Sequence, residues 1–268
     1  MKEIKKEYHS GQIVESRTGR VLSISQFLNS LEEARAVFVG EEHDNLQHHR
    51  VQAEIISGLY YRSVPLAVGM EMLPRESQPI LDQWTLGEIN EQDFLKQVEW
   101  YKVWGYPFSL YRDLLVFARD HRIQVVALNA PGEVVKKVAQ RGLTGLSADE
   151  RSRIAKNIHL DNPAHRQMIY ERFLEHPTVA PDFEHFYEAQ RVWDETMAET
   201  LARLFDSTLN APQTVVVLSG ISHMNQGLGI PEAFARRTGF PYVLLIPATP
   251  GEVSDLIQEK AADYLWVI

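Results

Sequence analysis

Five short runs of apolar, mostly β-branched residues constrain the fold more than any other feature of this sequence. The runs are AVFVG (36–40), PLAVGM (65–70), IQVVAL (123–128), TVVVLSG (214–220) and PYVLLIP (241–247). They lack the regular alternation of apolar and polar residues, which is typical of parallel strands covered by helices on both faces. Helical stretches separate the runs, so right-handed βαβ crossovers and an α/β fold are predicted, with a mostly parallel central sheet flanked by helices.

Start signals for helices lie between these runs. Asp44 is placed to cap a helix that begins at Asn45, and Ser147 with Glu150 matches a capping box. Pro231 fits the first turn of a helix near the C-terminus, because proline is tolerated where the backbone N–H has no helical partner. The connections between the predicted strands are therefore expected to be helical.

The two ends of the chain differ from its middle. A β-hairpin is predicted around Thr18 and Gly19, followed by a short helix over residues 25–33. The final run, YLWVI (264–268), is predicted to be a last edge strand.

Two long intervals, 73–122 and 131–212, carry no strand signal. The second contains a long helix, predicted over residues 182–206 from its apolar stripe. We expect both intervals to be helical insertions that form a lobe over the carboxyl edge of the sheet. No linker or repeat divides the chain, so a single domain over residues 1–268 is expected.

The composition narrows the class of function. The chain has no Cys, which excludes disulfides, zinc fingers, iron–sulfur clusters and thiolate ligation of haem. Its formal charge of −9 and the lack of a basic stripe argue against a nucleic-acid partner. No apolar run reaches the roughly 18–20 residues of a transmembrane segment, and no apolar region follows the basic N-terminus as in a signal peptide. We therefore expect a soluble domain that binds a small molecule.

Polar side chains follow four of the predicted strands, and in three of them the side chain is ionisable. Two runs end in the same G-x-x-H pattern, GEEH at 40–43 and GISH at 220–223, and Glu71 and Asn129 follow two others. Loops at the carboxyl ends of parallel strands line the ligand crevice of such a sheet. We therefore expect one site that brings together the following side chains: Glu41, His43, Glu71, Asn129 and His223.

Several chemistries fit this set. His43, Glu71 and His223 offer nitrogen and oxygen ligands to a divalent metal such as Zn, Mn or Co, which would activate water against an ester or amide. Without metal, a His oriented by Glu can act as a general base on water. The same polar rim can instead hold the propionates or the iron of a porphyrin. The structural alternative is that each His only caps a strand end.

Two further segments supply candidate ligand-binding residues. The stretch 100–111 is rich in aromatic side chains, among them Tyr106 and Tyr111. Tyrosinate oxygen suits ferric haem, whereas most aromatic clusters simply fill a core. Tyr187, Gln190 and Asp194 share one face of the predicted long helix, either as a solvated face or as a polar row toward the crevice.

The first two turns of the helix predicted after His43 are rich in polar residues, among them Asn45, His48 and His49. Successive positions on a helix point about 100° apart. His48 and His49 therefore cannot both face one small ligand, and we expect one of them to lie behind the site or to face solvent.

The string GEEHDNLQHHRVQ (40–52) resembles the ChaN-like haem-binding uptake family, part of the Tiki/TraB/erythromycin-esterase superfamily. Further matching segments are VGMEM (68–72), LNAP (128–131), AQRVWDETMA (189–198) and SGISH (219–223). The resemblance implies an α/β core with a helical lobe, haem binding linked to iron acquisition, and a place in the cell envelope. It also implies haem held through a Tyr and a homodimer around cofacial haems.

The resemblance and the residue patterns together give two sets of candidate site residues. For haem, the cofactor-binding candidates are Asn45, His49, Tyr106, Tyr111, Asn129, Tyr187, Gln190 and Asp194. For a hydrolase of ester or peptide bonds, which the wider superfamily implies, the catalytic roles map onto Glu41, His43, Glu71 and His223. Haem binding is the first expectation and hydrolysis, with or without a divalent metal, is the alternative.

Overall fold

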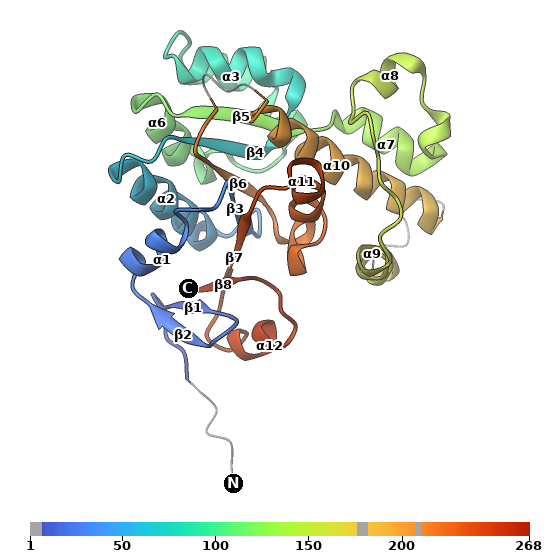
Figure 1. Cartoon of the computed structure of the whole chain (residues 1–268). Coiled ribbons are helices and arrows are strands. Elements are labelled where there is room, and N and C mark those ends of the chain that lie inside the picture. The colour runs from blue at the N-terminus through green and yellow to red at the C-terminus, as the bar shows by residue number, and fades with distance from the viewer. Residues whose placement is uncertain (1–6, 176–181, 207–210) are drawn as a thin grey trace.

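The computed structural model describes residues 7–175, 182–206 and 211–268. Its strands form one sheet in the order β2-β1-β8-β7-β3-β6-β4-β5 (Figure 1). The strands are β1 (Ile13–Glu15), β2 (Arg20–Leu22), β3 (Ala36–Glu41), β4 (Leu66–Pro74), β5 (Gln124–Asn129), β6 (Thr214–Gly220), β7 (Tyr242–Ala248) and β8 (Tyr264–Val267). The six strands from β8 to β5 pair in parallel, and β1 pairs antiparallel with β2 and β8. The prediction of a mostly parallel α/β sheet with an N-terminal hairpin is confirmed.

Helices cover both faces of the sheet and extend into a lateral lobe (Figure 1). The helices are α1 (Ile24–Ser30), α2 (Leu46–Tyr61), α3 (Gln78–Thr85), α4 (Glu91–Gln97), α5 (Trp100–Val103), α6 (Arg112–Asp120), α7 (Gly132–Arg141), α8 (Ala148–Ser152), α9 (Pro163–Glu175), α10 (Phe183–Arg203), α11 (Ile230–Thr238) and α12 (Val253–Gln258). The lobe contains α7, α8 and α9 and lies beside the long helix α10. Of the helices described, none is both long enough and apolar enough to cross a bilayer.

Strand β3 shows why the apolar runs do not alternate. Its side chains Val37 and Val39 point into a core shared with α2, whereas Ala36 and Phe38 point into a second core shared with α11. Both faces of the strand are therefore buried and need apolar residues. A third, smaller core fills the lobe between α7, α9 and α10 and includes Val135.

Several predicted boundaries are wrong by a few residues. Asn45, and not Asp44, caps α2, because the backbone of Asn45 is extended and its side chain accepts from the Gln47 N–H. The long helix is Phe183–Arg203, with Asp182 as its cap, and the first helix is Ile24–Ser30. The capping box of Ser147 and Glu150 is present as predicted.

The prediction that the last run forms an edge strand is wrong. Strand β8 lies between β7 and β1, because the N-terminal hairpin adds antiparallel to its open side. The edges of the sheet are β2 and β5. Strand β4 also runs to Pro74, beyond the predicted end of its apolar run.

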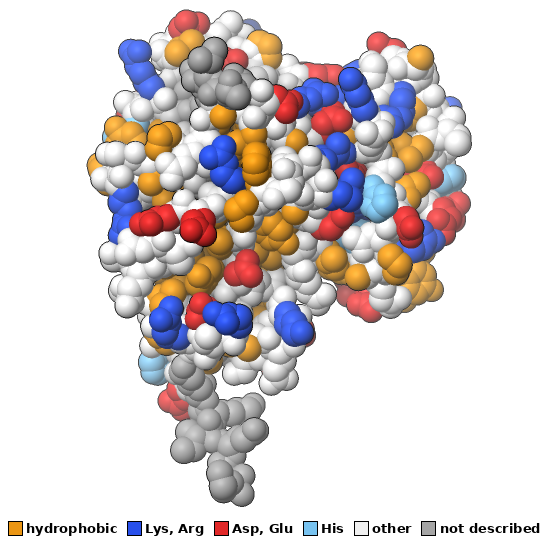
Figure 2. Space-filling model, in the orientation of Figure 1, with side chains coloured by type: hydrophobic (Ala, Val, Ile, Leu, Met, Phe, Trp, Pro, Cys, Tyr) orange, Lys and Arg blue, Asp and Glu red, His pale blue; other side chains and the backbone are white. Residues whose placement is uncertain are grey.

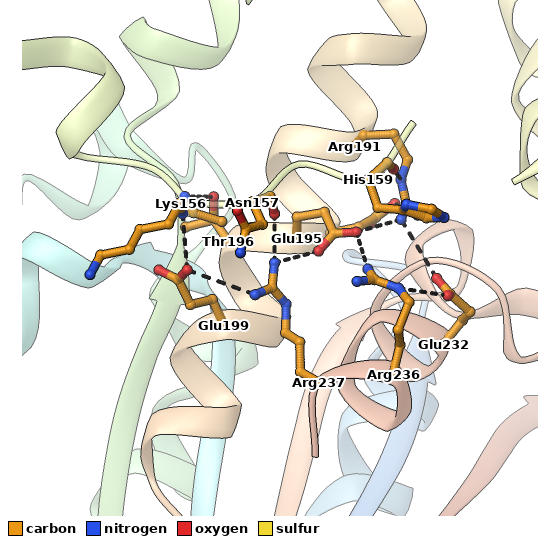
Figure 3. Close-up of polar contacts among 12 residues, drawn as sticks. Lys156, Asn157, His159, Arg191, Glu195, Thr196, Glu199, Glu232, Arg236 and Arg237 are labelled. Carbon is orange, nitrogen blue, oxygen red and sulfur yellow. Dashed lines mark hydrogen bonds and ion pairs between the residues drawn. The ribbon is translucent and has the colours of Figure 1, made fainter. Parts of the chain in front are cut away.

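A buried ion cluster ties the lobe to the sheet-covering helices (Figure 3). The carboxylate of Glu195 on α10 is fully buried and pairs with Arg191 on its own helix and with Arg236 and Arg237 on α11. Arg237 also donates to the backbone carbonyl of Asn157 at 2.7 Å. We call these four ionic side chains the Glu195 cluster; they hold α10, α11 and the segment around Asn157 together.

The face shown in Figure 2 carries Lys and Arg side chains among Asp and Glu side chains, without a large area of one sign.

Candidate functional site

A pocket of about 410 Å³ lies at the carboxyl ends of the central strands. His43 follows β3, Glu71 lies in β4, Asn129 ends β5 and His223 follows β6, and all four line the pocket. Parallel strands bring their carboxyl ends to one edge, which is why residues up to 180 positions apart meet here. The helical insertions supply much of the remaining wall, including Val103, Trp104, Tyr106, Gly132, Arg172, Phe186, Gln190 and Trp193.

A larger cavity, about 760 Å³, lies between β1, β7 and β8. It is lined by residues such as Glu15, Tyr242 and Asp263, and no histidine is among its described lining residues. The smaller pocket at the carboxyl edge, which contains the ionisable groups predicted from the sequence, is therefore the candidate site.

The imidazole of His43 is held by a buried carboxylate. Its Nδ1 lies 2.9 Å from Oε1 of Glu41, which also accepts from the Tyr111 hydroxyl at 2.7 Å. The other oxygen, Oε2, accepts from the side-chain amide of Gln52 at 2.7 Å and lies 3.4 Å from Nδ1 of His49. A proton on Nδ1 of His43 leaves its Nε2 lone pair for a ligand in the pocket.

These contacts shift the pKa values of the groups around Glu41. Burial alone would raise the pKa of Glu41, but hydrogen bonds from His43 and His49 outweigh it and hold the pKa at about 2. Burial and the adjacent carboxylate both raise the pKa of Tyr111. In this structure the Tyr111 hydroxyl donates to Oε1 of Glu41.

Protein stability is expected to fall as the pH drops from 4.5 to 2, partly through Glu41. The carboxylate has a folded pKa of about 2 against an ordinary 4.5, so its contribution is complete above 4.5 and is lost as the pH falls toward 2. The linked free energy is on the order of 3 kcal/mol. Urea unfolding of wild type and Glu41→Gln at several pH values measures it. We expect a smaller loss of stability across this window in Glu41→Gln; equal pH slopes in the two proteins would contradict the account.

The second imidazole, His223, is held in the same way by a different carboxylate. Its Nδ1 lies 2.7 Å from Oδ1 of Asp194 on α10, and Oδ2 of Asp194 lies 3.1 Å from Nε2 of the fully buried His165. Burial alone would raise the pKa of Asp194, but hydrogen bonds with the two imidazoles outweigh it and lower the pKa. Burial would lower the pKa of His223, but the charges of Glu71 and Asp194 outweigh it and raise the pKa.

Glu71 lies between the two histidine-bearing strand ends. Its Oε2 accepts from the Ser219 hydroxyl at 2.5 Å and from the Gly220 N–H at 2.7 Å, and its Oε1 lies 3.4 Å from Nε2 of His223. The carboxylate is therefore fixed by β6, and the pocket contains two imidazoles with one carboxylate beside the second.

The glycine that begins the second G-x-x-H motif allows a close approach. A Cβ atom on Gly220 would lie 2.9 Å from Cε1 of His43, so any side chain would push the ring away. Gly220 has a φ of −55°, so the motif uses glycine for its small size and not for a left-handed turn.

The predicted cofactor-binding residues fall into two groups. Tyr106, Asn129 and Gln190 line the pocket. The pocket lining does not include Asn45, His49, Tyr111, Tyr187 or Asp194. Asn45 caps α2, and Tyr187 packs in the core of the lobe. His49 and Tyr111 contact Glu41, which holds His43, and Asp194 itself holds His223.

Three of the alternatives left open by the sequence are now decided. Gln190 and Asp194 are buried with Tyr187, so this row of α10 is not a solvated face. His48 and His49 are both buried, so neither faces solvent. The aromatic stretch divides: Trp100, Phe108 and Tyr111 fill the core, Tyr101 is exposed, and Trp104 and Tyr106 form a wall of the pocket.

The rings that flank His43 and His223 give the pocket aromatic walls. Trp104 and Tyr106 lie edge-on to the His43 ring, with ring centroids 4.6 and 5.2 Å away. Trp193 lies edge-on to His223 at 5.9 Å. Contacts of this kind fix the orientation of the imidazoles and supply broad apolar surface for a flat ligand.

Sequence reasoning missed Arg172 and His165, both on α9. The apolar residues of α9 do not form a clear stripe, so no pattern indicates which of its side chains face the pocket. His165 is completely buried beside Asp194, and Arg172 reaches the pocket wall. Only the packing of the lobe against α10 reveals these positions.

The predicted metal ligands were His43, Glu71 and His223. All three line the pocket. Within residues 7–175, 182–206 and 211–268, however, no group of three or more His, Asp or Glu side chains has the arrangement of a metal site. The donor set therefore does not fit a divalent metal as it stands, and we base no chemical step on one.

Comparison with known proteins adds a family match. A family model described as "Haem-binding uptake, Tiki superfamily, ChaN" matches residues 27–234. No curated protein sequence matches the chain.

Solved structures give the same fold. ChaN of Campylobacter jejuni, described as binding cofacial haem, is 20% identical, with a TM-score of 0.73 and 97% of each chain covered. An erythromycin esterase in its open conformation is 13% identical, with a TM-score of 0.51, and 89% of this chain and 76% of the esterase are covered. At these identities the likeness shows the fold alone.

Proposed function

The chain belongs to the haem-binding uptake family of the Tiki superfamily, and we propose from this premise that it binds haem in the pocket at the carboxyl edge of its sheet. The observation that carries the proposal is the set of side chains that line this pocket. Aromatic rings lie beside nitrogen and oxygen donors in a pocket whose volume, about 410 Å³, is typical of small-molecule sites. A macrocycle of haem size would lie partly outside such a space.

The donors present fit an iron porphyrin. Among the lining residues, the Tyr106 hydroxyl and the Nε2 atoms of His43 and His223 are suitable iron ligands. Haem would supply a redox-active, Lewis-acidic iron, and the protein supplies the apolar walls and the fixed donors. The buried carboxylates Glu41 and Asp194 hold the imidazoles by their Nδ1 atoms, which raises the basicity of the opposite nitrogen.

Hemin titration tests this proposal directly. We expect a Soret shift on adding hemin to the wild type, saturating at about one haem per chain in the micromolar range or tighter. No shift at micromolar hemin would contradict the proposal.

A pocket-blocking variant locates the binding. Gly132 lines the pocket, and a Cβ atom there would contact nothing within 4 Å, so Gly132→Trp has room to fold and fills the pocket. We expect at least a tenfold loss of hemin affinity. Gly251→Trp is the matched control, because Gly251 is equally open but does not line this pocket. Equal affinities of the two variants would show that haem binds elsewhere.

A role in iron acquisition and a homodimer complete the proposal. Both are suggested by the family, together with a location in the cell envelope. Sedimentation with and without hemin tests the dimer: we expect the mass of two chains when haem is bound.

Hydrolysis of an ester or peptide bond is the second candidate. The observation that favours it is that two imidazoles, each held at Nδ1 by a buried carboxylate, line one pocket. In this arrangement Nε2 of His43 takes a proton from water, and protonated His223 stabilises charge or protonates the leaving group. A panel of esters and peptides, assayed with and without chelator, tests the candidate. Activity that survives both His43→Ala and His223→Ala would contradict it.

A further inference from the structure

Arg172 lies at the wall of the candidate pocket and has no partner among the described residues. It projects from α9, is half-buried and lines the pocket together with His223. Among the described residues it makes no hydrogen bond and no ion pair, and its Nη1 atom is buried without a partner. Burying one end of a guanidinium without a hydrogen-bond acceptor costs free energy.

Several other arginines buried to a similar or greater degree are paired with carboxylates, whereas the half-buried Arg35 has no ion pair among the described residues and lies over the rings of Phe205 and Phe240. Arg75 contacts Glu199, and Arg191 and Arg237 contact Glu195. Arg172 differs from these paired arginines, and it is the only Lys or Arg among the described residues that line the pocket.

No carboxylate among the described residues pairs with Arg172. The one acidic side chain in the pocket lining, Glu71, is already bound by Ser219 and Gly220 and makes no ion pair with Arg172. The segment that follows α9, residues 176–181, has the sequence HPTVAP and contains no Asp or Glu. An acidic partner is therefore expected from the ligand.

We propose that Arg172 binds a carboxylate of the pocket's ligand, and, resting on the proposed function, that this carboxylate is a haem propionate. The planar guanidinium can bind a carboxylate through two parallel hydrogen bonds, which fixes both the position and the orientation of the ligand. The other ionisable lining groups are His43, Glu71 and His223, and both imidazoles are already held by carboxylates. Arg172 thus gives the pocket its selectivity for an anionic porphyrin edge.

Porphyrins with and without free carboxylates test this assignment. We would titrate hemin, hemin dimethyl ester, metal-free protoporphyrin IX and its dimethyl ester into wild type, Arg172→Gln and Arg172→Lys. We expect the wild type to bind each free acid about tenfold or more tightly than its ester, as for a charge-assisted hydrogen bond. This preference should vanish in Arg172→Gln, which should bind the esters like the wild type, and should return in part in Arg172→Lys. The metal-free pair shows that the effect does not act through the iron.

Arg166→Gln is the matched control. Arg166 lies on the same helix, pairs with Glu184 and does not line the pocket, so the variant removes the same charge outside the site. We expect it to keep the wild-type preference for the free acids, and thermal unfolding checks that each variant is folded.

The outcomes separate the two proposals. Equal affinity of the wild type for acid and ester, or a preference that survives in Arg172→Gln, would overturn the role of Arg172 while haem binding stands. If Arg166→Gln also loses the preference for the free acids, the preference depends only on the net charge of the protein. That result would also overturn the role of Arg172. A wild type that binds none of the four porphyrins would overturn the proposed function, and this assignment with it.

Discussion

Glu195→Gln is expected to lower the free energy of unfolding by about 3 kcal/mol. Glu195 is completely buried, and its two oxygens pair with Arg191, Arg236 and Arg237. A neutral amide would leave these guanidinium groups close together with less negative charge between them. Breaking a buried ion pair costs more than the pair itself contributes, because the remaining charges are desolvated. Urea unfolding at neutral pH measures the loss.

The matched control is Glu184→Gln on the same helix. Glu184 is exposed and pairs only with Arg166 among the described residues, so its loss should cost less than about 1 kcal/mol. Equal losses in the two variants would show that the Glu195 cluster does not hold α10 against α11. The cluster also lies next to Asp194 in the chain, so a loosened α10 should weaken hemin binding in Glu195→Gln but not in the control.

Gly229→Ala is expected to damage both the fold and the site, with a loss of stability of about 2–4 kcal/mol. Gly229 has φ 73° and ψ −123°, a conformation that residues other than glycine rarely adopt. A Cβ atom there would lie 2.3 Å from the backbone carbonyl oxygen of His223 and 3.3 Å from Oδ2 of Asp194. The backbone at His223 would have to move, and this movement would disturb the hydrogen bond between the His223 ring and Asp194. Hemin affinity should therefore fall about tenfold or more.

Gly239→Ala separates backbone strain from the contact with His223. Gly239 has a similar φ of 69°, but a Cβ atom on it would meet nothing within 4 Å. This variant should lose about 1 kcal/mol and keep the wild-type affinity for hemin. A Gly229→Ala protein as stable as Gly239→Ala, with unchanged hemin binding, would contradict the account of the turn after β6.

The fold was predictable where a pattern is local. Each apolar run became a strand because both of its faces are buried, as β3 shows with Val37 toward α2 and Phe38 toward α11. Local sequence patterns could not predict which strands are neighbours in the sheet. The place of β8 between β7 and β1 depends on pairing with a hairpin about 250 residues earlier in the chain, which no short-range signal encodes.

The candidate site was likewise predictable only in the part that depends on the strands. The meeting of His43, Glu71, Asn129 and His223 in one pocket follows from the geometry of parallel strands, which needs no side-chain detail. The lobe residues were not predictable in this way, because the packing of α9 against α10 decides that Arg172 reaches the pocket and His165 does not. The polar row of α10 was visible, but not that Asp194 would hold His223. The functional roles of these residues stay predictions.

The central claim, that haem binds at the carboxyl edge of the sheet, is tested most directly by X-ray diffraction at the iron absorption edge from crystals of the hemin complex. An anomalous peak for iron inside the pocket, between the aromatic wall of Trp104 and Tyr106 and the side chain of Arg172, is the result that this account predicts. An iron peak elsewhere, for example in the larger cavity beside Tyr242, with the pocket free of porphyrin density, would contradict it.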